Sequence, residues 1–352
     1  MQFSNVVIQH MGYALGPNKL TSEEIEKRLA PMYERLRLPA GRLELMTGIK
    51  ARQFWERDTK ASEASTYAAQ NLLDATQYPK EQIDLLIHSA VSRDRLEPAT
   101  AAYVHEKIGL PGHTQILDIS NACLGFLNSI VLSAGLIETR QVRNVLIVAG
   151  ENGQPLVEHT IKQLLNPDHT RKSIKPYFAN LTIGAGAVAA ILTHNDNIVS
   201  GQALQIESAT LQTDTSHNHL CEGDNAASAA GSLEMQTDSE ELLHAGTELA
   251  KKNWALFKEQ SGWTEETPDH TFTHQVGRAH QKLLYETLGL NEEKDFCTFP
   301  ELGNVGSVSL PITLALAMER GLIQNNERSA LLGIGSGLSS IMLGVIKREF
   351  TK

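Results

Sequence analysis

This 352-residue sequence lacks two features whose absence excludes broad classes of protein. It has no apolar run of the roughly 18 residues that span a bilayer, so we expect no integral membrane protein. Residues 1–10 lack a basic segment followed by a long apolar one, which argues against a secretory signal and for a cytoplasmic protein. The length predicts two domains, or one large domain with two halves.

Cysteine and positive charge are also scarce. The three cysteines, Cys123, Cys221 and Cys297, are odd in number and widely spaced, which argues against a disulfide framework and fits a reducing compartment. The formal net charge of −10 gives no general attraction to nucleic acid or to an anionic membrane surface. The few cysteines and the negative net charge fit a globular enzyme.

The segment 118–138 is the most distinctive stretch of the chain. From Leu124 to Ile137 it contains no charged residue, which predicts a helix packed on all sides. Cys123 precedes the first turn of this helix, where free N–H groups and the helix dipole favour the nucleophilic thiolate over the thiol. The alternative is a small inert cysteine at the start of a core helix, because free cysteines are commonly buried.

Apolar strands and amphipathic helices alternate along the chain, which predicts a layered α/β fold. Residues 45–49 are expected to form a turn and residues 93–98 a charged loop. The expected helices lie at 21–37, 62–77, up to 108, 124–137, 239–259, up to 288 and 311–318. The expected strands lie at 83–92, 116–119, 142–149, 183–193, 202–213, 270–275, 330–334 and 341–346.

The second half of the chain repeats the order of elements of the first. Cys123 follows the Ile-Gly-Leu end of one helix by 13 residues, and Asn304 follows the Leu-Gly-Leu end of another by 14. A largely uncharged helix and then an apolar strand come after each of them. We therefore predict two similar halves, residues 1–180 with the cysteine and residues 181–352 with a histidine and the asparagine.

Four short motifs stand in order along the chain. They are Asn-Ala-Cys-Leu-Gly-Phe at 121–126, Thr-His-Gln at 273–275, Gly-Asn-Val-Gly-Ser at 303–307 and Gly-Ile-Gly-Ser-Gly-Leu at 333–338. In order and spacing they resemble the ketoacyl-ACP synthase III branch of the thiolase superfamily, and the similarity covers nearly the whole chain. The resemblance implies a thiolase-like, five-layered αβαβα fold and a homodimer.

The resemblance also implies catalytic roles. The family's active cysteine falls on Cys123, which would take an acyl group from a thioester. Its histidine and asparagine fall on His274 and Asn304, which would donate hydrogen bonds to the carbonyl oxygen of a second thioester and stabilise its enolate. The backbone N–H groups of Cys123 and Ser336 would hold the oxyanion of the acyl-enzyme. Taken singly, such a histidine or asparagine is more often structural, so the joint pattern carries this interpretation.

One loop points to a subgroup of that branch. Arg-Asp-Arg-Leu-Glu-Pro-Ala-Thr at 93–100, together with Phe-Pro-Glu-Leu-Gly-Asn at 299–304, resembles the head-to-head acyl-CoA condensing enzymes of long-chain olefin biosynthesis (OleA type). In those enzymes the glutamate matching Glu97 reaches the active site of the partner subunit and is proposed to deprotonate the second acyl chain. A decarboxylating synthase needs no such base, because loss of CO₂ supplies the carbanion. The alternative for Glu97 is a solvated loop carboxylate.

The acyl carrier stays open between CoA and an acyl carrier protein. Synthases of this branch usually clamp the adenine of CoA with a Trp and an Arg, and Arg42 and Met46 stand at the corresponding places here. An acidic carrier protein would instead need a basic patch, although such a charge run is usually a solvated face. The candidate residues for that patch are Arg171, Lys172, Lys175 and Arg278.

Two other patterns predict no further ligand. His-Asn-His-Leu-Cys at 217–221 contains metal-ligand residue types but has no second cluster, so we expect no metal site. The Gly-rich run at 333–337 is followed by a strand-like segment rather than a helix, so we expect no nucleotide cofactor. Acyl-CoA or acyl-ACP is expected as substrate.

The sequence therefore predicts an acyltransferase that joins two acyl thioesters, as long-chain acyl-CoA, by Claisen condensation to a 3-oxoacyl product. One alternative is a decarboxylating 3-oxoacyl-ACP synthase III that uses malonyl-ACP. The others are a Cys-His thioester hydrolase and a catalytically silent partner subunit. The intact Cys123, His274 and Asn304 argue against silence, and two separate oxyanion arrangements argue against simple hydrolysis.

Overall fold

A large mixed sheet organises the molecule, whose computed structural model describes residues 1–223 and 235–351. Within these residues the strands of the large sheet run in the order β11-β12-β13-β8-β1-β7-β6-β4-β5. Their bounds are β1 (Val6–Ala14), β4 (Leu85–His88), β5 (Gln115–Asp118), β6 (Asn144–Asn152), β7 (Ala185–His194), β8 (Ser200–Thr213), β11 (His270–Thr273), β12 (Arg328–Gly335) and β13 (Ser339–Thr351).

The sheet consists of two halves with the same topology. In each half the first strand pairs antiparallel with the last: β1 with β7, and β8 with β13. The last strand pairs antiparallel with the one before it, and that strand pairs parallel with β4 or β11. A parallel bridge between Thr271 and Asp295 occupies the place that β5 has in the first half. The predicted repeat is confirmed, and β1 and β8 join the halves antiparallel.

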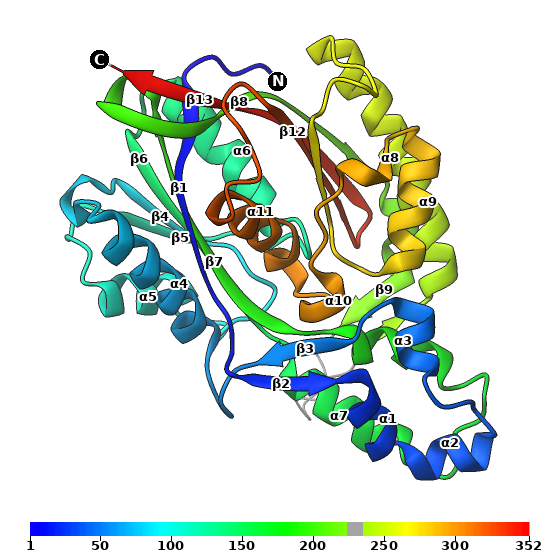
Figure 1. Cartoon of the computed structure of the whole chain (residues 1–352). Helices are drawn as coiled ribbons and strands as arrows, with labels where there is room; N and C mark the ends of the chain where they lie inside the picture. Colours follow the sequence, from blue (N-terminus) through cyan, green and yellow to red (C-terminus); the bar gives the residue numbers. More distant parts are fainter. Residues whose placement is uncertain (224–234, 352) are drawn as a thin grey trace.

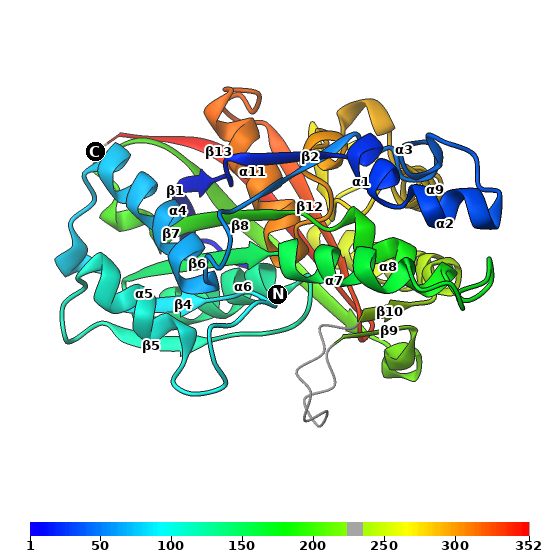
Figure 2. The same cartoon turned by 90° about the horizontal axis from the view of Figure 1, so that it is seen from below.

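Helices cover both faces of each half and produce five layers (Figures 1 and 2). Helices α4 and α5 lie outside the first half, α8 and α9 lie outside the second, and α6 and α11 lie between the two. The α-helices are α1 (Ser22–Arg28), α2 (Ala30–Leu36), α3 (Arg42–Thr47), α4 (Ala61–Thr76), α5 (Thr100–Ile108), α6 (Gly125–Glu138), α7 (Gln154–Leu164), α8 (Ser239–Ser261), α9 (Arg278–Leu288), α10 (Phe299–Leu302) and α11 (Ser309–Glu319).

Short elements complete the described part of the chain. Two small sheets pair β2 (Asn18–Thr21) with β3 (Ala51–Phe54) and β9 (Cys221–Gly223) with β10 (Met235–Thr237). The 3₁₀ helices are η1 (Lys80–Gln82), η2 (Lys175–Thr182), η3 (Asn195–Asn197), η4 (Thr215–Leu220), η5 (Glu292–Lys294) and η6 (Gly306–Val308). In residues 1–223 and 235–351, no helix combines the length and apolar character needed to cross a bilayer.

The central helices α6 and α11 are apolar because they lie between the two halves of the large sheet. Helix α11 buries nine of its residues, from Ser309 to Ala317. Helix α6 is buried on most of its surface, but Leu132 is 43% exposed. The expectation that α6 is packed on all sides is therefore wrong for the described part of the chain, because no element within residues 1–223 and 235–351 covers the face that carries Leu132.

Local signals predicted some N-terminal boundaries and missed others. The capping box of Thr21 and Glu24 starts α1 as expected. The single helix expected at 21–37 is two helices, because Pro31 near the start of α2 has no N–H to continue the ladder of α1. The turn expected at 45–49 is the end of α3 followed by Gly48 at φ +73°.

The proposed division between residues 180 and 181 falls inside η2 (Lys175–Thr182). Strand β7 comes directly after this point and pairs with β1 and β6, so it completes the first half of the sheet. Strand β8 then begins the second half. The boundary between the two predicted halves, residues 1–180 and 181–352, stays a prediction.

Candidate active site

Cys123 lies at the junction of the central layer and the second half of the sheet. Ala122 has φ +44°, which turns the chain sharply before α6 begins at Gly125. The end of β12 presses on this junction: a Cβ added at Gly335 would lie 2.9 Å from Leu124 Cγ and 3.7 Å from the Cys123 nitrogen. Glycine at this position therefore lets the strand end approach the cysteine.

The electrostatics of Cys123 differ from the expectation drawn from the helix start. Burial, with smaller contributions from Cys221 and Glu151, raises the pKa of the Cys123 thiol to about 12. Desolvation disfavours the charged thiolate by more than the hydrogen bond from the backbone N–H of Cys123 favours it. The resting form of Cys123 is consequently a thiol, and the predicted thiolate is wrong for the free enzyme.

His274 follows β11 directly and is also buried. Its backbone N–H donates to the Leu332 carbonyl oxygen of β12 at 3.2 Å, which fixes it beside β12 at the end of β11. Burial, together with nearby His280, lowers the pKa of His274 to about 3. Nδ1 is enclosed and has no hydrogen-bond partner among the described residues. His274 is therefore a neutral imidazole that carries one N–H at neutral pH.

Asn304 is held by its backbone and by its side-chain oxygen. Its N–H donates to the Thr182 carbonyl oxygen at 2.9 Å, and its carbonyl oxygen accepts from Gly184 N–H at 2.8 Å. Its Oδ1 accepts from Gly306 N–H at 3.0 Å and from Ser309 Oγ at 3.3 Å. Since Oδ1 is satisfied, the amide orientation is set, and Nδ2 has no partner in residues 1–223 and 235–351.

Two backbone donors also lack acceptors. In the part of the chain that the structure describes, the N–H groups of Cys123 and Ser336 donate to no other residue. Ser336 directly follows Gly335, which packs close to the Cys123 nitrogen, so the two residues are neighbours at the end of β12. Unpaired, partly buried N–H groups of this kind can bind an oxyanion.

Shared neighbours connect the three predicted catalytic side chains. Strand β12 lies beside His274 at Leu332 and beside Cys123 at Gly335. Ser307 Oγ, three residues after Asn304, donates to the Ser89 carbonyl oxygen at 2.9 Å. A Cβ on Gly125 would lie 3.5 Å from the same Ser89 oxygen, so the Asn304 turn and the start of α6 meet there.

Glu97 lies elsewhere, on the loop between β4 and α5. It is exposed, as is neighbouring Leu96, which is 87% exposed. Further back in this loop Asp94 accepts from Ser62 N–H at 2.9 Å and from Ser62 Oγ at 2.6 Å. The chain thus anchors the loop while Glu97 extends away from its own core.

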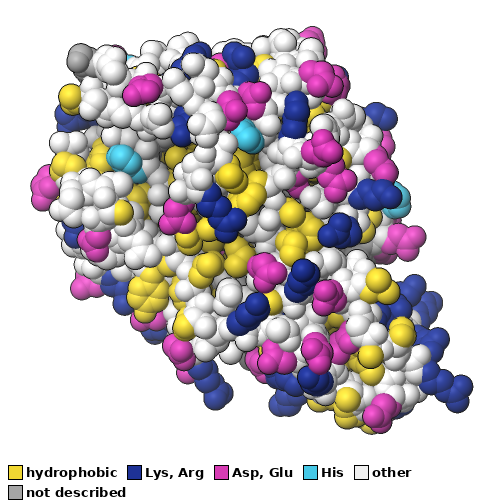
Figure 3. Space-filling model, in the orientation of Figure 1, with side chains coloured by type: hydrophobic (Ala, Val, Ile, Leu, Met, Phe, Trp, Pro, Cys, Tyr) yellow, Lys and Arg dark blue, Asp and Glu magenta, His cyan; other side chains and the backbone are white. Residues whose placement is uncertain are grey.

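The basic candidates occupy different positions. The Arg171 guanidinium donates to the carbonyl oxygens of Leu36 and Arg37 at 2.7 and 2.8 Å and so caps α2. Lys172 and Lys175 are exposed. Lys and Arg side chains gather at the corner of α1 and α2, interspersed with acidic ones (Figure 3).

Arg278 and the two CoA-clamp positions meet near α3. Arg278 begins α9 beside Gly48, where a Cβ would lie 3.1 Å from the Cβ of Arg278. Arg42 and Met46 both belong to α3, and Met46 is 52% exposed. The corner between α3 and α9 therefore combines a cation with an exposed apolar side chain.

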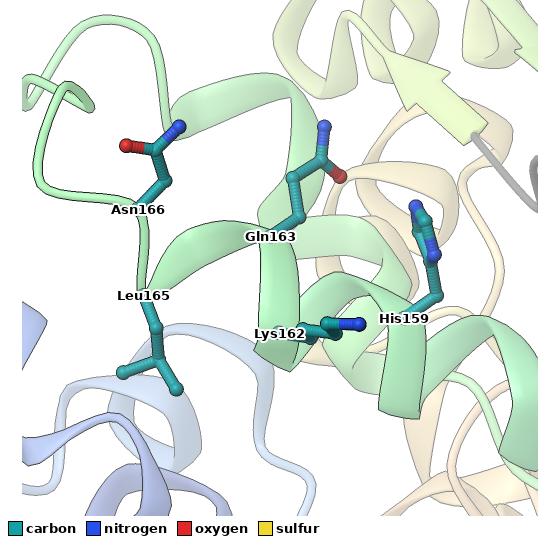
Figure 4. Close-up of a pocket in the computed structure, with 5 residues that line it drawn as sticks. All are labelled: His159, Lys162, Gln163, Leu165 and Asn166. Atoms are coloured by element: carbon teal, nitrogen blue, oxygen red, sulfur yellow. The ribbon is translucent and has the colours of Figure 1, made fainter.

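A surface hollow of about 500 Å³ lies at the C-terminal end of α7 (Figure 4). It contains none of Cys123, His274 or Asn304. The residues that line it are His159, Lys162, Gln163, Leu165 and Asn166.

Residues 217–221, considered above for metal binding, lie in η4 and at the start of β9. Within the described residues, no three His, Cys, Asp or Glu side chains are grouped as metal ligands.

Glu151 was not predicted from the sequence, yet it lies close to the predicted catalytic residues Cys123 and Asn304. It is 5% exposed, near the end of β6, and its charge acts on Cys123 and on His88. The only sequence signal is a Gly-Glu pair at the end of an apolar strand, where buried carboxylates are uncommon.

Family models of known proteins match the two segments of the chain that contain the predicted site residues. The family model described as 3-oxoacyl-[acyl-carrier-protein] synthase III matches residues 117–215, which include Cys123. The C-terminal model of that family matches residues 259–345, which include His274, Asn304 and Ser336. Acyl-CoA:acyl-CoA alkyltransferases of Shewanella oneidensis and Xanthomonas campestris pv. campestris are each 36% identical over 98% of this chain, and the matches cover 99% and 100% of those proteins.

Solved structures of Xanthomonas campestris OleA are similar over 98% of the chain. One with bound cerulenin has a TM-score of 0.93, 36% identity and 98% coverage of that protein. One with bound lauric acid and lauroyl-CoA has a TM-score of 0.92, 35% identity and 99% coverage. Other structures carry replacements of one cysteine, one histidine or one glutamate. That glutamate and cysteine are separated by as many residues as Glu97 and Cys123 are here.

Proposed function

The chain belongs to the 3-oxoacyl-[acyl-carrier-protein] synthase III family of the thiolase superfamily, and on that premise we propose that it joins two acyl-CoA molecules head to head in a Claisen condensation. The product is a 3-oxoacyl thioester. The chain is thus an acyltransferase with the five-layered fold of that superfamily. Its substrates are acyl thioesters, and the reaction needs no redox cofactor.

In the first step Cys123 takes an acyl group. Its sulfur attacks the thioester carbonyl carbon, and the CoA sulfur leaves with the proton that the Cys123 thiol gives up. The N–H groups of Cys123 and Ser336 bind the oxygen of the tetrahedral intermediate, because neither has another partner in the described residues. A neutral resting thiol is compatible with this exchange, since the proton passes to the leaving thiolate.

In the second step Glu97 of the partner subunit removes a proton from the α-carbon of a second acyl-CoA. The enolate oxygen accepts hydrogen bonds from Asn304 Nδ2 and from neutral His274 in the tautomer that is protonated on Nε2. The α-carbon then attacks the acyl carbonyl on Cys123. The carbon–carbon bond forms, the Cys123–acyl bond breaks, and the Cys123 sulfur regains a proton from Glu97.

The observation that carries this proposal is the set of unpaired donors around the end of β12. Four groups hydrogen-bond to no other residue of the described chain: the amides of Cys123 and Ser336, the Asn304 amide nitrogen and the His274 ring. Two carbonyl oxygens must be bound in a condensation and one in a hydrolysis. Two pairs of donors therefore favour condensation.

The test is product analysis by mass spectrometry with lauroyl-CoA alone and then with malonyl-ACP added. Lauroyl-CoA is suitable because a structure of the similar Xanthomonas enzyme contains it. We expect a 3-oxo product from lauroyl-CoA alone, and Glu97→Gln should still acylate Cys123 but make no such product. Turnover only with malonyl-ACP would favour the decarboxylating synthase, and release of free lauric acid alone would favour the hydrolase.

We further propose that the enzyme is a homodimer that uses CoA as carrier in the cytoplasm. The exposed Leu96 beside Glu97 supports a second copy, because an isolated chain would leave this apolar side chain in water. Arg278 and Met46 at the corner of α3 and α9 are the proposed contacts for the carrier. Three free, widely spaced thiols support a reducing compartment.

A further inference from the structure

Glu151 joins two segments that the proposed mechanism assigns to different active sites. Oε1 accepts from Val91 N–H at 2.8 Å, from Ser307 N–H at 3.3 Å and from Ser307 Oγ at 2.8 Å. Oε2 accepts from Ser92 N–H at 3.0 Å and from Ser92 Oγ at 2.7 Å. A buried carboxylate with this many donors holds its neighbours in one arrangement.

On one side Glu151 anchors the loop that carries Glu97. Val91 and Ser92 form the beginning of this loop, and the Asp94 contact with Ser62 fixes it a second time. The end of the loop is held where Asp118 accepts from the N–H groups at the start of α5, at 2.7 and 2.9 Å. The position of exposed Glu97 therefore depends on anchors that lie inside its own subunit.

On the other side Glu151 holds the turn that follows Asn304. A Cβ on Gly306 would lie 3.0 Å from Glu151 Oε1, so this turn packs directly on the carboxylate. Gly306 in turn donates its N–H to Asn304 Oδ1, which sets the direction of Nδ2. Gly306 is therefore the single residue that connects Glu151 with the Asn304 amide.

We propose that Glu151 is a positioning residue for two active sites at once: it orients Asn304 in its own subunit, and it orients Glu97 for the site of the partner subunit. This inference rests on the proposed function, in which Glu97 acts across the dimer. The carboxylate links the enolate-binding group of one site to the base of the other.

Replacement by glutamine removes the link while keeping the shape. One carboxylate oxygen becomes an NH₂ group, which cannot accept a hydrogen bond. In one orientation of the amide this group faces the N–H groups of Val91 and Ser307, and in the other it faces the N–H group of Ser92. At least one anchor is lost in either orientation. A displacement of about 1 Å at a reacting group can slow catalysis by up to about 10²-fold.

Mixed dimers separate the two effects. In the first, a Glu151→Gln subunit pairs with a Cys123→Ala subunit, so the working site has an altered Asn304 turn and a normal Glu97 loop. In the second, a subunit with both changes pairs with an unchanged one, so the working site has a normal Asn304 turn and an altered Glu97 loop. We expect condensation to fall about 10-fold or more in both. Acylation of Cys123 should not slow in either, because loss of the Glu151 charge lowers the pKa of the Cys123 thiol rather than raising it.

Glu138→Gln, placed in the same two arrangements, is the matched control. Glu138 accepts from Ser4 N–H, Asn5 N–H and Asn5 Nδ2 at 2.9 to 3.3 Å, but it lies at the far end of α6 from Cys123. Condensation equal to this control in either mixed dimer would overturn the inference. So would parallel losses of acylation and condensation, which indicate a merely structural role.

Two milder changes test each side alone and are safer for folding. In mixed dimers, Ser92→Ala should slow condensation only when it is placed in the subunit that lacks Cys123. Ser307→Ala should slow condensation only when it is placed in the subunit that keeps Cys123. The reverse pattern, or no difference between the two placements, would contradict a two-site role. If the unchanged dimer itself makes no 3-oxo product from lauroyl-CoA, the proposed function fails and the inference fails with it.

Discussion

At the scale of single residues, Cys123 shows how burial can override a helix start. Burial raises the pKa of its thiol to about 12, well above the value near 8.5 of an ordinary cysteine. Since alkylation requires the thiolate, we expect the rate of Cys123 modification by iodoacetamide to rise about tenfold per pH unit between pH 7 and 9. Timed alkylation followed by peptide mapping measures this rate separately from those of Cys221 and Cys297.

Glutathione, a small exposed thiol, serves as the reference in that experiment, because its rate levels off once the pH exceeds its ordinary pKa. A Cys123 rate that is already constant at pH 7 would show a resting thiolate and contradict the pKa shift.

His274 makes stability depend on pH. Burial lowers its pKa to about 3, whereas in the unfolded chain its pKa is about 6.5. Between these values the unfolded state binds a proton that the native state does not, so the free energy of unfolding falls as the pH is lowered from 6.5 towards 3. His274→Asn removes this contribution, and its stability should fall less steeply over that window, by up to about 1.4 kcal/mol per pH unit.

Urea unfolding at pH 7.5, 6 and 5 would measure both slopes. His113→Asn, at an exposed position outside the site, is the control and should follow the unchanged enzyme. Equal slopes for His274→Asn and the unchanged enzyme would mean that His274 is protonated in the native state.

At the scale of elements, the turn at Gly303 decides where Asn304 lies. Gly303 has φ +69°, and a Cβ there would lie 2.4 Å from the Thr182 carbonyl oxygen that accepts the Asn304 N–H. Gly303→Ala should therefore lower the free energy of unfolding by about 1 to 3 kcal/mol and slow condensation more than acylation. Urea unfolding and single-turnover acylation measure the two effects.

Gly112→Ala is the matched control for that turn, because a Cβ at exposed Gly112 would meet nothing within 4 Å. Its stability and rates should equal those of the unchanged enzyme. If Gly303→Ala behaved in the same way, the turn would have room to relax and would not determine the position of Asn304.

Sequence predicted those elements whose signals are local. The capping box at Thr21 and every strand of the large sheet except β1 were found, and so was the repeat that relates the two halves. Helix α7 was missed because no side chain caps its start. Strand β1 was missed because its burial depends on β7 and β8, which lie far along the chain.

The residues of the candidate site also differ in whether a local sequence signal marks them. Cys123, His274 and Asn304 each stand in a short motif, so the sequence was enough to select them. Glu151 has no motif, because its partners Val91 and Ser307 are 60 and 156 residues away and come together only in the fold. The direction of the Cys123 pKa shift was likewise beyond the sequence, since burial is a property of the assembled layers.

At the scale of the whole molecule, one chain alone leaves apolar side chains in water. Leu96, Leu132 and Ile116 are 87, 43 and 39% exposed on three different elements. A second copy would cover such positions, and we expect light scattering to give twice the 38.6 kDa of one chain. A mass of one chain at micromolar concentration would contradict the dimer.

The proposed dimer also predicts complementation between inactive variants. Glu97→Gln and Cys123→Ala should each make no 3-oxo product from lauroyl-CoA, whereas their mixture should recover up to about a quarter of normal activity, because half of randomly paired dimers contain one complete site. Subunits must first be dissociated and reassociated, and an unmixed sample treated in the same way is the control. Formation of mixed dimers without recovery would show that Glu97 serves its own subunit.

The order of strands in the sheet has a consequence for synthesis of the protein. Strand β1 leaves the ribosome early, but its neighbours β7 and β8 begin only at Ala185 and Ser200. At the usual pace of translation this apolar strand waits roughly 10 to 40 s for a partner. The unpaired edge of such a strand can form hydrogen bonds with strands of other nascent chains. The protein is therefore most prone to aggregation while it is being made, before the first half of its sheet can close.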